Sequence, residues 1–161
     1  MLLNNKIVLV SGIGPGLGVK LAVEAAREGA AGVIVSARSA DKLDDAEQRI
    51  QALGTGTQVL KQTCDITDRG QCEALVAAAV KTFGRIDALV NSAFLHGAMD
   101  YVSSADLDSW SVPLNTNLIG TLKLTQATLP QMKTQGGGAI VMINTMAARQ
   151  VPPLGEAGYA A

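Results

Sequence analysis

The segment SGIGPGLG, residues 11–18, has the residue types and spacing to hold a charged ligand. It joins the apolar run KIVLV to an amphipathic helical pattern, which predicts a turn from a strand into a helix. The first amides of a helix have no partner within that helix, so they attract an anion. Gly12 would allow a positive φ, Gly16 would let a pyrophosphate approach the backbone, and Gly18 would let the helix pack closely. The alternative is a glycine-rich turn that binds nothing.

The donors in this turn are restricted by its proline. Pro15 has no N–H group, so the amides would come from Gly14, Gly16 or Leu17. The fixed φ of proline also suits a position beside a helix start. We therefore expect an anionic group to lie over these three amides.

The elements that would position the turn alternate along the chain. Short β-branched runs predict strands at residues 6–11, 32–37, 57–64, 86–91 and 139–144. Helical patterns occupy residues 16–29, residues 68–83 and parts of 94–134, where Pro113 should begin or kink a helix. A further helix is expected after Ser39, which should cap its first turn. This order predicts the α/β class, with a Rossmann-type doubly wound parallel sheet and helices on both faces. Residues 1–161 are interpreted as one dinucleotide-binding domain.

Composition excludes several classes of function. The net charge is −1 with no basic block, which argues against nucleic-acid binding. No apolar run reaches the roughly 18 residues that cross a bilayer, and the N-terminus MLLNNK is too polar for a signal peptide. Cys64 and Cys72 lack metal-site spacing, so we expect reduced thiols, no metal and a cytoplasmic location.

Several segments in order resemble the short-chain dehydrogenase/reductase family, classical type, over the whole chain. Ser11, Gly12, Gly16 and Gly18 are similar to its GxxxGxG pattern and the small hydroxyl residue before it. The other similar segments are CDITD (64–68), NSAF (91–94), NLIG (117–120), AIVMINTMAA (139–148) and AGYAA (157–161). The resemblance implies a Rossmann fold, a nicotinamide dinucleotide as cofactor and a small alcohol or carbonyl compound as substrate.

The end of the second strand bears on which dinucleotide is bound. An acid at this point would bind the ribose hydroxyls of NAD, but this chain has Ala37, followed by Arg38 and Ser39. Arg38 can bind a 2′-phosphate, which favours NADP(H), with NAD(H) as the alternative. The resemblance further implies that Asp65 and Ile66 contact the adenine; a helix-initiating acid is the other interpretation of Asp65. It also implies that Asn91 and Ala93 support the ribose side.

The resemblance assigns the catalytic roles. Tyr159 would be the acid or base, Thr145 would stand where the family has serine, and Asn117 would relay a proton through water. From the residue alone, Tyr159 is equally an ordinary surface tyrosine, and a strand-end threonine is the alternative interpretation of Thr145. The family's lysine, four residues after the tyrosine, would fall at position 163, beyond Ala161. We therefore expect a truncated chain that cannot catalyse as it stands.

Residues around these positions suggest the character of the substrate. Phe94 replaces the last glycine of the family's N-N-A-G motif and is expected to crowd the loop. Substrate contacts are assigned to Phe94, His96 and Met146, and the apolar character extends to Val151 and Pro152. For His96 a solvated loop position is favoured over a substrate contact, and Trp110 is expected in the core.

Two functions fit the sequence. The first is an NADP(H)-dependent oxidoreductase that interconverts a secondary alcohol and a ketone and, when complete, forms a homodimer or homotetramer. The second is a non-catalytic NAD(P)-binding or sensing module, or an inactive fragment. The presence of both Tyr159 and Thr145 favours the enzyme.

Overall fold

The computed structural model describes residues 1–150 and 157–160. Its sheet has five parallel strands: β1 (Ile7–Ser11), β2 (Gly32–Ala37), β3 (Gln58–Thr63), β4 (Ala88–Asn91) and β5 (Ala139–Met142). The strands stand in the order β3-β2-β1-β4-β5, so the direction of winding reverses between β1 and β4. The predicted doubly wound sheet is therefore confirmed, and the strands end within two residues of their predicted bounds.

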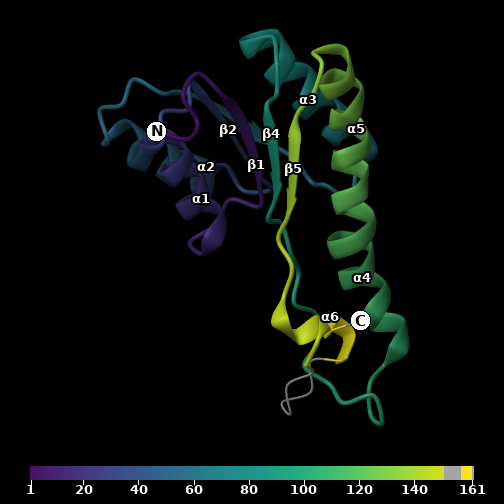
Figure 1. Cartoon of the computed structure of the whole chain (residues 1–161). Coiled ribbons are helices and arrows are strands. Elements are labelled where there is room, and N and C mark those ends of the chain that lie inside the picture. The colour runs from purple at the N-terminus through teal and green to yellow at the C-terminus, as the bar shows by residue number, and fades with distance from the viewer. Residues whose placement is uncertain (151–156, 161) are drawn as a thin grey trace.

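Helices cover both faces of this sheet (Figure 1). Helices α1 (Leu17–Arg27) and α2 (Ala40–Gln51) pack on one face, and α3 (Arg69–Phe83) and α5 (Thr121–Thr134) pack on the other. Alternate residues of β1 enter the two cores: Val8 and Val10 face α1 and α2, whereas Ile7 and Leu9 face α3 and α5. A strand buried on both faces must be apolar throughout, which explains the continuous run in the sequence.

The segment around Pro113 changes its helical pitch repeatedly. A 3-10 turn, η1 (Leu107–Trp110), leads into α4 (Ser111–Leu114), a π-helical turn η2 (Asn115–Gly120) and then α5. Pro113 lies in the first turn of α4, where its missing N–H group costs no helical hydrogen bond. The predicted helix start is confirmed, but the wider turn after it was not predicted from the sequence.

The predicted cap of α2 is only half correct. Ser39 is the N-cap residue and Asp41 lies in the first turn, but the Ser39 side chain makes no capping hydrogen bond. The start of α3 contrasts with it, because Asp68 accepts a hydrogen bond from the Gln71 N–H group. The hydroxyl of Ser39 is therefore not committed to its own helix.

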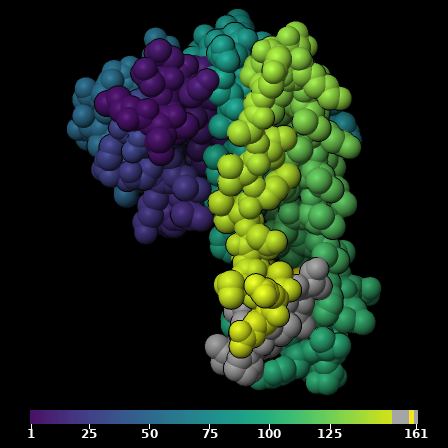
Figure 2. Space-filling model, in the orientation of Figure 1, coloured from purple at the N-terminus to yellow at the C-terminus, as the bar shows by residue number. Residues whose placement is uncertain are grey.

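Strand β5 stands at one edge of the described sheet and is apolar. Val141, Met142 and the following Ile143 are 44%, 47% and 41% exposed. Figure 2 shows this segment running along the surface between the two halves of the molecule. Among the described residues, no helix is both long and apolar enough to cross a bilayer.

Asp87 fixes the register between β1 and β4 at their first residues. Its carboxylate accepts a 2.9 Å hydrogen bond from the Ile7 N–H group, and the Arg85 guanidinium donates to it at 2.6 Å and 3.0 Å. Burial on its own would raise the pKa of Asp87, but the hydrogen bonds from Arg85 and Ile7 outweigh it and hold the pKa below its ordinary value.

We expect Asp87→Asn to lower the free energy of unfolding at pH 7 by about 1–2 kcal/mol, because the charged acceptor is lost. The folded-state pKa is depressed, so this stabilisation exists above the ordinary pKa of about 3.9 and disappears as pH falls through the folded value. Urea unfolding at pH 7 and pH 3 measures both effects. Glu73→Gln, an exposed acid on α3, is the control and should change little. A destabilisation by Asp87→Asn that is equal at both pH values would contradict this account.

Candidate active site

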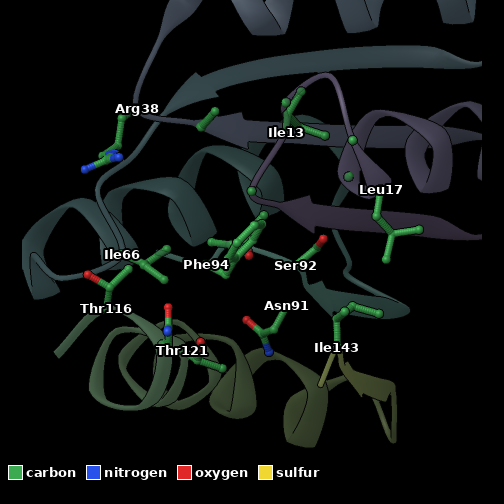
Figure 3. Close-up of a pocket in the computed structure, with 18 of the residues that line it drawn as sticks. Ile13, Leu17, Arg38, Ile66, Asn91, Ser92, Phe94, Thr116, Thr121 and Ile143 are labelled. Atoms are coloured by element: carbon green, nitrogen blue, oxygen red, sulfur yellow. The ribbon is translucent and has the colours of Figure 1, made fainter. Parts of the chain in front are cut away.

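A cavity of about 910 Å³ opens at the carboxyl ends of the strands, where the winding of the sheet reverses between β1 and β4 (Figure 3). This is the position at which parallel α/β sheets bind ligands. All the residues predicted to bind a cofactor line it, as do the predicted catalytic residues. They are Ser11, Gly12, Gly14, Gly16, Leu17, Gly18, Arg38, Ser39, Asp65, Ile66, Asn91, Ala93, Asn117, Thr145 and Tyr159. Sequence segments far apart in the chain are thus gathered around one space.

The glycines of the first loop divide into two kinds. Gly12 has a φ of +83°, and a Cβ atom there would overlap the backbone of Ala93. A Cβ atom at Gly18 would overlap the carbonyl oxygen of Gly12. By contrast, no heavy atom lies within 4 Å of a Cβ placed on Gly14 or Gly16. The protein needs Gly12 and Gly18 for its own backbone packing, whereas the space beside Gly14 and Gly16 is open and could be filled by a bound ligand.

Three buried polar atoms in the lining lack partners. They are Ser11 Oγ, Ser36 Oγ and Asn91 Oδ1, and Ser11 stands opposite Ser36 in the β1–β2 register. The Asn91 Nδ2 group is satisfied, because it donates a 3.1 Å hydrogen bond to Thr125 Oγ1. Buried polar atoms are nearly always paired, so these three atoms fit a site whose ligand supplies hydrogen bonds. Ser36 and Thr125 were missed from the sequence, since a serine within an apolar strand and a threonine within a helix carry no motif.

Charged side chains lie in the part of the cavity that follows β2 and β3. Arg38 is exposed at the end of β2 and lines the cavity with Ser39. The Asp65 carboxylate accepts hydrogen bonds from Thr67 N–H at 2.9 Å and Thr67 Oγ1 at 2.7 Å, which hold its pKa below the ordinary value. Asp65 therefore forms a local turn before α3, whose own cap is Asp68. An adenine bound here would have to share the Asp65 carboxylate with Thr67.

Asn117 holds the loop that follows β4. Its Oδ1 atom accepts a 2.7 Å hydrogen bond from Leu95 N–H, and its Nδ2 group donates at 2.9 Å to the Leu95 carbonyl oxygen. Asn117 lies within the π-helical turn η2, so the altered pitch sets the direction of this side chain. The residue predicted to relay a proton thus also binds the backbone of the loop after β4.

Thr145 stands just beyond β5. Its Oγ1 atom accepts a 3.2 Å hydrogen bond from Ala147 N–H and so caps the short 3-10 turn η3 (Met146–Ala148). The hydroxyl proton is not used in that bond, because an oxygen that accepts can still donate. A strand-end capping role and a substrate contact are therefore compatible in this residue.

Tyr159 lies in α6 (Ala157–Ala160) and contacts two rings from the loop after β4. The His96 ring stacks on it, with centroids 4.7 Å apart and planes at 19°, and the Phe94 ring lies at 6.1 Å and 53°. Phe94 is 64% exposed and lines the cavity. His96 lies in a loop, as expected, but it is half-buried with its ring against Tyr159 and not fully solvated.

Other expectations about the substrate side need correction. Among the described residues, the cavity lining includes Phe94 but neither His96 nor the strongly exposed Met146. Trp110 is not a core residue: it is half-buried, and its ring lies 3.1 Å from the position of a Cβ on Gly158. Val151 and Pro152 lie outside the described residues.

Comparison with known proteins agrees with this geometry. Residues 6–161 match the family model described as short chain dehydrogenase. Human dehydrogenase/reductase SDR family member 4 is 32% identical over 151 residues, which cover 94% of this chain and 53% of that protein.

Two solved structures carry cofactors in their descriptions. NAD+-bound xylitol dehydrogenase superposes with a TM-score of 0.91 at 30% identity, covering 98% of this chain and 59% of that one. Actinorhodin polyketide ketoreductase with NADPH superposes with a TM-score of 0.87 at 30% identity, covering 97% of this chain and 59% of that one. The chain spans little more than half the length of these relatives.

Proposed function

The chain belongs to the short-chain dehydrogenase family of NAD(P)-dependent oxidoreductases, and from this premise we propose that its full-length protein uses NADP(H) to interconvert a secondary alcohol and a ketone. One observation carries the proposal. The glycine loop, Arg38 and the residues Asn117, Thr145 and Tyr159 all line one cavity, with the anion-binding groups and the proton-transfer groups in a single space. The substrate is a small molecule, and the apolar side chains in the lining favour a moderately hydrophobic one.

The residues present fit a dinucleotide. The amides at the start of α1 and the open space at Gly14 and Gly16 would take the pyrophosphate. The unpartnered atoms of Ser11, Ser36 and Asn91 would gain partners from the bound cofactor. The planar, charged guanidinium of Arg38 would donate two parallel hydrogen bonds to a 2′-phosphate, and the Ser39 hydroxyl, which makes no capping bond, would add a further one.

Proton transfer is assigned to the other end of the cavity. The nicotinamide, when bound, accepts or supplies the hydride. Tyr159 would hold or release the proton at the substrate oxygen, and Thr145 would donate its free hydroxyl hydrogen to the same oxygen. Asn117 would support the relay while it fixes Leu95.

We further propose that the full-length protein is a cytoplasmic homodimer or homotetramer. Both cysteines are free thiols, which fits a reducing compartment. Leu118, Leu122 and Leu129 are exposed along the long helical segment and form an apolar strip, of which Leu118 and Leu122 also line the cavity and Leu129 does not. An exposed apolar strip is typical of a symmetric interface.

Arg38→Ala is expected to raise the Kd for NADPH by about 10- to 150-fold, the equivalent of one charge-assisted hydrogen bond. The Kd for NADH should change by less than about threefold, because NADH has no phosphate for the guanidinium to bind. Isothermal titration calorimetry with both cofactors measures this difference. Arg49→Ala, which removes an arginine on α2 outside the cavity, is the matched control. An equal loss for both cofactors would refute the NADP(H) assignment.

Tyr159→Phe in the full-length protein is expected to lower kcat by about 10²- to 10⁴-fold, because the proton donor is removed while the ring remains. The Kd for NADPH should stay within about threefold, since the phenol hydroxyl is assigned to the substrate. Steady-state kinetics against a panel of ketones, together with calorimetry, separates the two quantities. Tyr101→Phe serves as the control. Activity within tenfold of the natural protein would instead favour a cofactor-sensing module.

The oligomer is expected to dissociate when the apolar strip is charged. Leu129→Glu places a carboxylate on this strip, away from the cavity, where it would be desolvated in an interface. Light scattering at micromolar concentration should give a dimer or tetramer for the natural full-length protein and a smaller species for the variant. A natural protein that is monomeric under these conditions would overturn the interface.

A further inference from the structure

We propose that His96 is a positioning residue for Tyr159: its flat ring, stacked on the phenol ring, holds the tyrosine in the orientation that proton transfer requires. This inference rests on the proposed function, because it gives Tyr159 a catalytic role. The only functional role that the sequence suggests for His96 is a substrate contact, and the residue lies outside the cavity lining and beyond the NSAF segment at 91–94, so a positioning role is a different assignment.

The geometry of the pair carries the inference. The two ring centroids lie 4.7 Å apart with an interplanar angle of 19°, which is the offset-stacked arrangement that aromatic pairs favour. Phe94 adds a tilted contact to the same tyrosine at 6.1 Å. Residues 94 and 96 are two apart, and Leu95 between them lines a separate recess with Arg38 and Asp65. Alternate side chains of one loop therefore take opposite directions, and two of them contact Tyr159.

The loop that carries His96 is itself held in place. Asn117 binds both the N–H group and the carbonyl oxygen of Leu95, the residue directly before His96. Gly97, directly after it, has a φ of +78°, and a Cβ there would lie 3.1 Å from Pro113 Cγ. The backbone before His96 is thus hydrogen-bonded to Asn117, and the backbone after it lies close to Pro113. A ring on a fixed backbone can restrict the movement of a second ring, whereas a ring on a loose loop could not.

Side chains from other parts of the chain surround Tyr159 and its neighbour Gly158. The His96 and Phe94 rings lie against the Tyr159 ring, and the Trp110 ring lies beside Gly158. A displacement of a reacting group by about 1 Å lowers the rate on the order of 100-fold. Restricting the movement of the phenol ring would therefore keep the rate of proton transfer high. Through Leu95, the same asparagine proposed for the proton relay also orients the tyrosine.

The test compares two variants that separate the ring of His96 from its polarity. His96→Phe keeps a flat ring, and His96→Gln keeps a polar side chain without one. Met99→Ala, an exposed residue of the same loop outside the cavity, is the matched control. For each full-length variant, steady-state kinetics gives kcat, KM and the pH profile, and NMR with ¹³C-labelled tyrosine reports the Tyr159 ring, assigned by Tyr159→Phe.

We expect His96→Gln to lower kcat by about 10- to 100-fold, with the KM for the cofactor within about twofold. In the same variant the Tyr159 ring signals should shift, because the stacked ring is lost. His96→Phe should keep kcat within about threefold and the pH profile unchanged, since it retains the stack without an ionisable group. Met99→Ala should match the natural protein in both measurements.

Three results would overturn the inference. They are an unchanged Tyr159 ring signal in His96→Gln, a kcat within threefold in that variant, or a loss in His96→Phe as large as that in His96→Gln. Failure of the proposed function gives a different pattern, because Tyr159→Phe would then remain active. If Tyr159→Phe is inactive and His96→Gln is fully active, only the positioning role falls. The NMR comparison decides whether the stack exists independently of turnover.

Discussion

The site depends on one close approach of three backbone segments. Gly12, at the end of β1, meets the backbone of Ala93 after β4 on one side and Gly18 at the start of α1 on the other, with no room for a Cβ atom at either glycine. This contact sets how far apart β1 and β4 can stand where the winding of the sheet reverses. The cavity, the direction of the α1 amides and the path of the loop to His96 all follow from it.

Much of this arrangement could be predicted because its signals are local. A strand-to-helix turn can be recognised from an apolar run, glycines at fixed spacing and a helical pattern, and all three lie within the first 29 residues. Strands buried on both faces, such as β1 and β2, have continuous apolar sequences. The motif residues line one cavity because parallel strands bring their carboxyl ends to one edge of the sheet.

The parts that could not be predicted depend on contacts between distant residues. The hydrogen bonds from Asn117 to Leu95 span 22 residues, and the stack of His96 on Tyr159 joins a loop to a helix 63 positions later. Neither leaves a periodic pattern. The Ser39 side chain was expected to cap α2 by a local rule, but it lies beside the cavity and makes no capping bond. The π-helical turn after Pro113 also escaped prediction, since its residues have ordinary helical composition.

The contact of Trp110 with Gly158 gives the protein a built-in optical probe. Trp110 is the only tryptophan in the chain, and its indole ring lies against the helix that carries Tyr159. Indole emission responds to the polarity of its surroundings, so undocking of α6 would expose the ring to water and shift the fluorescence to the red. The order of α6 can thus be followed in solution without any label, and energy transfer from the same indole to a reduced nicotinamide would report binding of the cofactor.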